Sequence, residues 1–405
     1  MRLNRALIST ITLFSVVSNY AYSAVTQAKV SWPDKSWAVS TPVLEGVNND
    51  TIMKVLEDIS AGTYGSVDHF LVIRNGRIIA DQKYTVDYDE LFSKSGKTQS
   101  ENSAHIPEQY NYDDTSWHPF YQGTNLHTLQ SVTKSITSAA FGIAIDKGLI
   151  KSVELPIHPY FKTYQYDKTD LRKSQITIED ILTMRTGIDW FTEGGYDNNK
   201  HSTIEMENSN NWLQYILDRP MDKKPGTHYE YNDGASVLLG KILSEATGMR
   251  ADEWSKKHLF NPIGINEFKW KITPKGEADT EGGLYLSTYD LARIGYLFLR
   301  EGNWQGKQVI SKDWVKKSIT PIVDDINPDN NKVNPGYGYQ WYISDKSDTL
   351  IYLAAGYGGQ YIVVAPEFDI LMVVNSWSIH KKGTKSLYKI INQITSSIDT
   401  EVSSK

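Results

Sequence analysis

Short β-type runs lie at both ends of the chain, and helical periodicity fills its middle. The β-type runs, rich in Ile, Val, Leu and Tyr, cover residues 70–74, 77–80, 350–353, 361–364 and 370–374. The first two runs flank Asn75-Gly76, which predicts a hairpin because both turn residues tolerate positive φ. Apolar residues recur at the spacing of one helix face in residues 131–147, 177–184, 235–246 and 387–394.

This order of elements predicts an α/β fold. The two termini build one α/β unit, and a mostly helical part is inserted between them. The segment 86–123 is polar, tyrosine-rich and aperiodic, and it is too long for an ordinary connection. We interpret it as an insertion that folds over another part of the protein, such as a pocket wall.

The composition excludes several kinds of site. The net charge is −6, from 42 basic and 48 acidic residues, and no cluster of basic residues suggests a nucleic-acid partner. The absence of cysteine excludes disulfides, thiolate nucleophiles and cysteine zinc sites. The nine histidines form no close-spaced ligand pair, so we expect neither a metal ion nor another cofactor.

The N-terminus has the pattern of a secretory signal peptide. Arg2 and Arg5 precede an apolar stretch, residues 6–17, that is too short to span a bilayer, and Ala21-Tyr22-Ser23 offers small residues for cleavage. We expect residues 1–23 to be removed, which leaves a mature protein without a membrane span. That protein would be secreted, most simply into a bacterial periplasm. A membrane anchor or a buried helix is the alternative for the same segment.

The clearest candidate for chemistry is Ser131-Val132-Thr133-Lys134, at the start of a predicted helix. A spacing of three places the serine hydroxyl and the lysine amine on one helix face, where the lysine can activate the hydroxyl as a nucleophile. The N–H of Ser131, at the helix N-terminus, can point toward a developing oxyanion. A second such sequence, Ser386 to Lys389, lies in the closing helix without a partner motif, and we discard it.

Two further motifs follow along the chain. Pro225-Gly226 forms a turn that delivers Tyr231 just before the next predicted helix. A lysine ammonium beside Tyr231 would stabilise its phenolate and let it carry the serine proton. Gly356 belongs to a glycine-rich turn between two β runs, where glycine lets the backbone approach a ligand, and the Tyr357 N–H is our second oxyanion donor. Taken singly, each motif is also compatible with ordinary packing.

The order serine-x-x-lysine, tyrosine and a glycine-ending strand motif resembles the serine β-lactamase and penicillin-binding protein superfamily. It is most similar to class C β-lactamases and their relatives, the family VIII esterases and nylon-oligomer hydrolases. Matching phrases cover residues 70–76, 130–135, 182–187, 281–292 and 336–341. The resemblance implies a β-lactamase-like α/β (α+β) fold with an antiparallel sheet that is flanked by helices and built from both termini.

The resemblance also implies how the chain is divided. Residues 24–405 would form one β-lactamase-related serine hydrolase domain. Its α/β lobe would contain about residues 24–125 and 250–405, and its inserted helical lobe about residues 126–249. The oligomeric state stays open.

By the same resemblance, Ser131 is the nucleophile that the substrate acylates. Lys134 is its activating partner and Tyr231 is the general acid and base. The N–H groups of Ser131 and Tyr357 form the oxyanion hole. The implied reaction is acyl transfer through a covalent ester that water later hydrolyses.

The chain departs from the family pattern at its second motif, which is usually tyrosine-x-asparagine but here ends in Asp233. Tyr196-Asp197-Asn198 matches that spelling, yet it lacks the Pro-Gly turn before it and the helix behind it, so we favour Tyr231. A carboxylate at Asp233 should pair with Lys134 and hold it charged. The role of the base would then shift toward Tyr231.

The third motif departs as well. Where β-lactamases and penicillin-binding proteins show lysine or histidine, a small residue and glycine, this chain has Ala354-Ala355-Gly356. The missing cation normally helps to bind the substrate carboxylate of penicillins and peptidoglycan stems. Efficient β-lactam hydrolysis and cell-wall carboxypeptidase activity are therefore disfavoured. Nylon-oligomer hydrolases and some esterases share a neutral residue there.

These features predict a secreted serine hydrolase that cleaves a small ester or amide. Asp233, Gly356, Trp190, Tyr196 and Trp341 are candidates for contact with the substrate, with packing as the alternative for the aromatic residues. Sequence does not separate esterase from amidase, since both use one mechanism. The alternatives are a non-catalytic, penicillin-binding-like module, or a weak β-lactamase or D-amino-acid peptidase.

Overall fold

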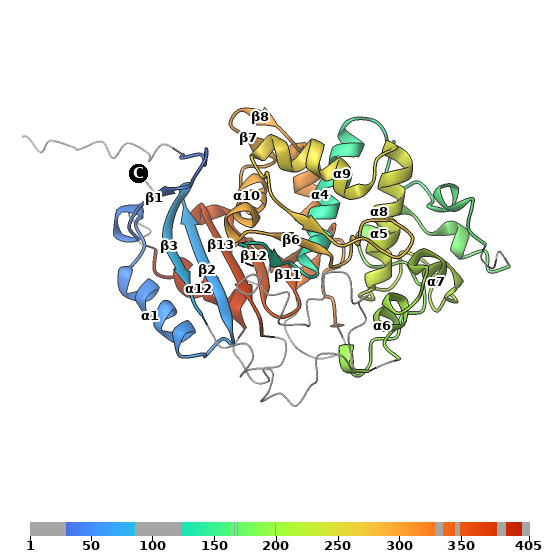
Figure 1. The fold of residues 1–405 in the computed structure, drawn as a ribbon, viewed down its shortest axis with the longest axis horizontal. Coiled ribbons are helices and arrows are strands. Elements are labelled where there is room, and N and C mark those ends of the chain that lie inside the picture. The colour runs from blue at the N-terminus through green and yellow to red at the C-terminus, as the bar shows by residue number, and fades with distance from the viewer. Residues whose placement is uncertain are drawn as a thin grey trace, which may run out of the picture.

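A computed structural model describes most of the chain (Figure 1). The described residues are 30–85, 123–165, 167, 169–198, 200–328, 335–344, 349–378 and 386–398. The expected signal peptide, residues 1–23, and all but the last residue of the segment 86–123 lie outside them.

An eight-stranded sheet forms the α/β part of the protein, with strand order β1-β3-β2-β13-β12-β11-β10-β9 (Figure 1). Neighbouring strands are antiparallel, except for the parallel pair β1 and β3. The predicted turn joins β2 to β3, and Asn75 and Gly76 have φ values of 51° and 75°. The strands are β1 (Ala38–Val39), β2 (Val67–Arg74), β3 (Arg77–Lys83), β9 (Gly336–Tyr337), β10 (Tyr342–Ser344), β11 (Ile351–Gly356), β12 (Gln360–Ala365) and β13 (Ile370–Ser376).

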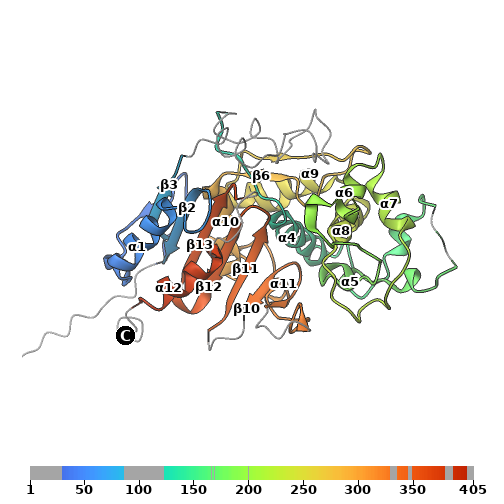
Figure 2. The same ribbon diagram turned by 90° about the horizontal axis from the view of Figure 1, so that it is seen from below.

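Helices cover both faces of this sheet (Figure 2). Successive side chains of a strand point to opposite faces, so each central strand contributes to two cores. On β13, Leu371 and Val373 join the core that contains α4 and α10, whereas Met372 and Val374 join the core that contains α1 and α12. The four helices are α1 (Asn49–Ser60), α4 (Val132–Asp146), α10 (Thr288–Leu299) and α12 (Ile390–Thr395).

The helical part of the protein lies beside the sheet, and α8 packs against α4 (Figure 2). Its helices are α5 (Ile178–Leu182), α6 (Ser202–Glu207), α7 (Trp212–Asp218), α8 (Asp233–Thr247) and α9 (Ala251–Ser255). The other elements are α11 (Lys312–Ser318), a small sheet of β4 (His127–Thr128), β6 (Leu284–Leu286) and β5 (Lys269–Trp270), and a hairpin of β7 (Asn303–Trp304) and β8 (Lys307–Gln308).

The fold class predicted from the sequence is confirmed. The hairpin of β2 and β3 pairs with β13, so the two ends of the described chain form one sheet with helices on both faces. The parallel pairing of β1 makes the sheet mixed, which the sequence did not indicate. Within the described ranges, no helix combines the length and the apolar character needed to cross a membrane.

Candidate active site

Ser131 and Lys134 lie on the same face of the first turn of α4. The short strand β4 pairs with β6 and leads into Gln130, whose φ of 50° turns the chain into the helix. Ser131 then takes the N-cap position, and the Lys134 Nζ donates to the Ser131 Oγ over 3.0 Å. The serine is half-buried and the lysine is 2% exposed, so this hydrogen bond forms at the edge of the core.

Three oxygen atoms surround the ammonium of Lys134 on its other side. The Asp233 Oδ1 lies 2.7 Å from the Nζ, the Glu281 carbonyl oxygen 2.6 Å and the Glu281 Oε2 3.3 Å. Burial alone would lower the pKa of Lys134, but the charges of Asp233, Tyr231 and Glu281 outweigh it and raise that pKa well above its usual range. Lys134 is therefore an ammonium at neutral pH, as expected from Asp233.

Tyr231 completes the group around Ser131. The Lys134 Nζ lies 5.3 Å from the centre of the Tyr231 ring, and the tyrosine hydroxyl lies close enough to the Ser131 and Lys134 side chains for both to lower its pKa. Burial raises the pKa of Tyr231 to about 12, although the charge of Lys134 opposes this effect. Tyr231 therefore lies beside both Ser131 and Lys134, and its hydroxyl could take a proton from Ser131 or return one.

The end of β11 approaches the residues that precede Ser131. A Cβ atom on Gly356 would lie 2.3 Å from the Leu129 carbonyl oxygen and 3.1 Å from the Gln130 Cβ, so only glycine permits this approach. Tyr357 follows directly, and its side chain is 38% exposed. Gly356, the residue before Tyr357, therefore lies against the residues that lead into α4.

Asp233 links Tyr196, the other tyrosine candidate, to Lys134. It is 1% exposed, and its Oδ2 accepts hydrogen bonds from the Thr203 Oγ1 at 2.5 Å and the Tyr196 hydroxyl at 3.2 Å. Burial would raise the pKa of Asp233, but the Lys134 charge and these hydrogen bonds lower it, so the carboxylate is ionised. Asp233 lies beneath the group around Ser131, bonded to Lys134, and leaves little surface for a substrate.

The similarity of this chain to a known protein family identifies the family to which it belongs. A family described as Beta-lactamase matches residues 66–386, which include every residue of the group around Ser131. The chain belongs to the Beta-lactamase family.

Several known proteins are similar to this Beta-lactamase-family chain. The 6-aminohexanoate-dimer hydrolase of Paenarthrobacter ureafaciens is 22% identical over 267 residues, which cover 62% of this chain and 66% of that protein. A putative 6-aminohexanoate-dimer hydrolase from Bacillus anthracis superposes with a TM-score of 0.64 at 16% identity, covering 92% of this chain and 89% of that one. EstCE1, a hydrolase with promiscuous acyltransferase activity, gives a TM-score of 0.63 at 13% identity, covering 88% and 99%.

The predicted substrate contacts of this Beta-lactamase-family protein occupy different surroundings. Tyr196 is half-buried and packs edge-on against the exposed Tyr357, with ring centres 5.3 Å apart. Trp190 is 1% exposed and Trp341 is 0% exposed, so both belong to the core. Trp341 contacts the rings of Phe298 and Tyr352, and Trp190 lies against Gly234 at the start of α8. Neither tryptophan has the exposed ring face that a substrate would need.

Sequence reasoning missed Glu281 and Thr203 as members of the site. Glu281 opens one of the phrases that carried the family resemblance, but nothing in its spacing from Lys134, 147 positions earlier, indicated their contact. The sequence likewise gave no indication of a role for Thr203, because a single threonine in a polar stretch has no distinguishing pattern. Only the fold brings these residues to Asp233 and Lys134.

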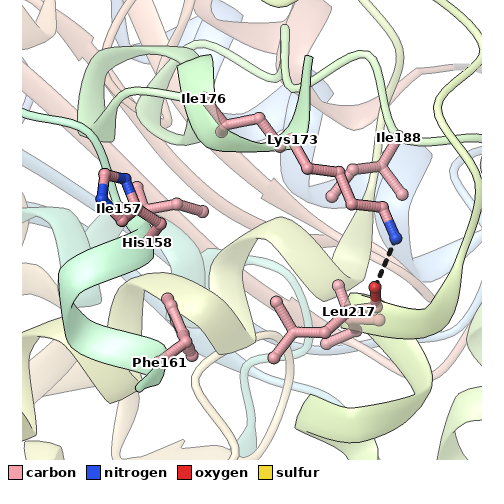
Figure 3. Close-up of a pocket in the computed structure, with 8 residues that line it drawn as sticks. Ile157, His158, Phe161, Lys173, Ile176, Ile188 and Leu217 are labelled. Atoms are coloured by element: carbon pink, nitrogen blue, oxygen red, sulfur yellow. Dashed lines mark hydrogen bonds between the residues drawn. The ribbon is translucent and has the colours of Figure 1, made fainter. Parts of the chain in front are cut away.

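A separate apolar pocket lies in the helical part of the protein (Figure 3). It shares no residue with the group around Ser131, and its walls are Ile157, His158, Phe161, Lys173, Ile176, Ile188, Ile216 and Leu217. The Lys173 Nζ donates to the Leu217 carbonyl oxygen over 2.6 Å, near the C-terminal end of α7. A lysine there satisfies a helix-terminal carbonyl, and this accounts for its burial without a catalytic role.

Proposed function

We propose that this protein is a secreted serine hydrolase that cleaves a small ester or amide through an acyl-enzyme on Ser131. The observation that carries the proposal is the contact between the Ser131 hydroxyl and two proton-handling groups, Lys134 at 3.0 Å and Tyr231. A hydroxyl needs such neighbours to become a nucleophile. Membership of the Beta-lactamase family, with hydrolases among the similar proteins, supports the same reaction class.

The proposed reaction begins when the Ser131 Oγ attacks the substrate carbonyl and its proton passes to ionised Tyr231. Lys134, fixed as an ammonium by Asp233, stabilises the phenolate that accepts this proton. The N–H groups of Ser131 and Tyr357 bind the oxyanion of the tetrahedral intermediate. Tyr231 gives the proton to the leaving group as the bond to that group breaks. Water then attacks the ester carbonyl and gives a proton to Tyr231, which passes it to the Ser131 Oγ as the ester bond breaks and the acid product leaves.

The neutral third motif supports a small, uncharged acyl group as the substrate. Ala354 is buried and Ala355 is half-buried on β11, at the positions where β-lactamases and penicillin-binding proteins carry a cation or a small polar residue. An anionic substrate would find no ammonium or imidazole at this strand. The similarity to the 6-aminohexanoate-dimer hydrolase, named for a linear amide, and to the hydrolase EstCE1 supports acyl transfer on a small linear substrate. We therefore expect linear amides or esters to be preferred over nitrocefin.

Mass spectrometry after treatment with a fluorophosphonate tests the nucleophile directly. The mature protein should gain one adduct and Ser131→Ala none. Nitrophenyl esters, a linear amide and nitrocefin, assayed on both proteins, should then rank the substrates. If neither protein is labelled and neither turns over any member of the panel, Ser131 is not an activated nucleophile, and a non-catalytic binding module becomes the better proposal.

A further inference from the structure

Glu281 places a second carboxyl group on the lysine of the proposed site. It is 4% exposed, and both its carbonyl oxygen and its Oε2 face the Lys134 Nζ, at 2.6 Å and 3.3 Å. Asp233 already provides one carboxylate for this ammonium at 2.7 Å. A buried ion pair needs only one counter-charge, so the second carboxyl group calls for an explanation beyond neutralising Lys134.

The backbone around Glu281 is fixed in this position. The Asp279 Oδ1 accepts hydrogen bonds from the N–H groups of Glu281 and Gly282, at 3.2 Å and 3.1 Å. Gly283 closes the turn, and a Cβ there would lie 2.6 Å from the Asp279 Cβ. The turn before β6 therefore holds the carbonyl oxygen of Glu281 against Lys134, and the buried side chain places its Oε2 beside the same ammonium.

Further charged groups meet Glu281 from the neighbouring elements. Glu207, the last residue of α6, makes a side-chain hydrogen bond with Glu281 and is 5% exposed. Lys271 follows β5, and its Nζ lies 3.8 Å from the Asp279 Oδ2. The positive charge of Lys271 also opposes the rise in the pKa of Glu207. With Asp233 and Lys134, these groups make two lysines and four carboxyl groups in one buried cluster. Burial of four carboxyl groups with only two lysines disfavours the ionisation of all four.

Burial raises the pKa of three of these four carboxyl groups, Glu207, Glu281 and Asp279. Burial, together with the charges of Asp279 and Asp233, raises the pKa of Glu281 to about 7 against the opposing effect of Lys134. Burial raises the pKa of Glu207 well above its usual range, which favours the protonated form of Glu207 as the donor of its hydrogen bond to Glu281. Asp233, in contrast, stays ionised because Lys134 and Thr203 lower its pKa.

We propose that Glu281 is a positioning residue of the hydrolytic reaction, which acts through Lys134 on the charge at Ser131 and Tyr231 and is itself held by Glu207. This inference rests on the proposed function of the Ser131 site. With a proton on Glu281, Asp233 and Lys134 neutralise each other. Without it, the cluster gains one negative charge, which disfavours a phenolate on Tyr231 and the oxyanion of the intermediate.

The proposal predicts a specific change in pH dependence. Glu281→Gln removes the additional negative charge, so a proton leaves the group of Ser131, Lys134 and Tyr231 more easily. Because the rise in kcat/KM reflects the Tyr231 phenol, whose pKa is about 12, a shift of about one unit should raise kcat/KM about tenfold at a given alkaline pH. The wild-type profile should also contain an inflection near pH 7, from ionisation of Glu281, that this variant lacks. A side chain that only supports the fold would change stability without moving the profile.

The experiment measures kcat/KM for 4-nitrophenyl acetate from pH 5 to 10 in the wild type and four variants. Glu281→Gln is the test, and Glu207→Gln, which keeps a neutral donor, should leave the profile close to that of the wild type. Glu45→Gln is the matched control, because Glu45 is also buried but bonds to Asn75, at the far hairpin. Ser131→Ala establishes that the activity belongs to the site.

Infrared difference spectra provide a readout that does not depend on turnover. A protonated carboxyl band that titrates near pH 7 should be present in the wild type and in Ser131→Ala but absent from Glu281→Gln. An unchanged pH profile and an unchanged band in folded Glu281→Gln would overturn the inference while leaving the hydrolase intact. Wild-type activity equal to that of Ser131→Ala would instead refute the proposed function, and the infrared result would still decide the ionisation of Glu281.

Discussion

At the scale of single residues, the two carboxyl groups beside the buried ammonium of Lys134 differ in the direction of their pKa shifts. Lys134 holds Asp233 ionised at 2.7 Å, whereas Glu281, at 3.3 Å, is left with a pKa near neutrality. The phenol of Tyr231 is protonated at rest, with a pKa of about 12. The reactive form of the site is therefore a minor one at neutral pH, and activity should increase into the alkaline range.

Replacing Tyr231 with phenylalanine tests which tyrosine handles the proton. The ring and its packing persist, but the hydroxyl that contacts Ser131 and Lys134 is lost, so kcat should fall by about 10²–10⁴-fold. Tyr196→Phe is the matched control, because its hydroxyl bonds to Asp233 instead and its loss should change kcat by about tenfold or less. Steady-state ester hydrolysis compares the two, and a larger loss in Tyr196→Phe would exchange their roles.

The raised pKa of Glu281 should also appear in folding stability. The folded state keeps this proton to about pH 7, whereas the unfolded chain releases it near pH 4.5. Stability from this group is therefore full below pH 4.5, falls as the pH rises and levels off above 7, with a total loss of about 3 kcal/mol. Urea unfolding should show that the free energy of unfolding of Glu281→Gln, relative to the wild type, increases by about 3 kcal/mol from pH 5 to pH 8. Equal effects at both pH values would contradict it.

At the scale of elements, the sequence predicted those whose pattern is local. Short apolar β-type runs and the Asn75-Gly76 turn predicted β2, β3, β11, β12 and β13, and helical spacing predicted α4, α5 and α8. Strands of two or three residues such as β1, β9 and β10 are too short for any periodicity to show. The candidate site divides in the same way, since Ser131 and Lys134 are neighbours on one turn, whereas Glu281 reaches them only through the fold.

The close approach of β11 to α4 is an element-level feature that one methyl group should disrupt. Gly356→Ala would place a Cβ 2.3 Å from the Leu129 carbonyl oxygen, so the strand must move away from Ser131. Because the Tyr357 N–H follows on that strand, we expect kcat to fall by about 10²-fold or more with a smaller change in KM.

Gly148→Ala is the control for Gly356→Ala. Gly148 ends the same helix, α4, with a φ of 71° and no atom within 4 Å of a new Cβ. The substitution should cost about 1 kcal/mol of stability and leave kcat unchanged. Unaltered kcat in a folded Gly356→Ala protein would remove Tyr357 from the oxyanion hole.

At the scale of the whole molecule, the site depends on segments far apart in the chain. Five segments each supply one part of it: α4, α6, α8, the turn before β6 and the end of β11. β13 joins these parts to the N-terminal hairpin, because it pairs with β2 on one side and β12 on the other. Since it contributes to the core on each face, β13 connects the site to the rest of the protein.

Leu371→Ala, in the centre of β13, tests this dependence on the sheet. The Leu371 side chain is fully buried and packs toward Gly295 of α10, so its loss leaves a cavity and should cost about 2–5 kcal/mol. Val39→Ala on the edge strand β1 is the control, because Val39 is 76% exposed and its truncation should change stability by about 0.5 kcal/mol or less. Urea unfolding measures both. Leu371 pairs with Val364 and Ile73 on the neighbouring strands and packs toward Gly295. The kcat of the folded Leu371→Ala protein should therefore match the wild type at low temperature and fall only as the variant unfolds on heating. A stable Leu371→Ala protein with reduced kcat would show instead that β13 adjusts the site directly.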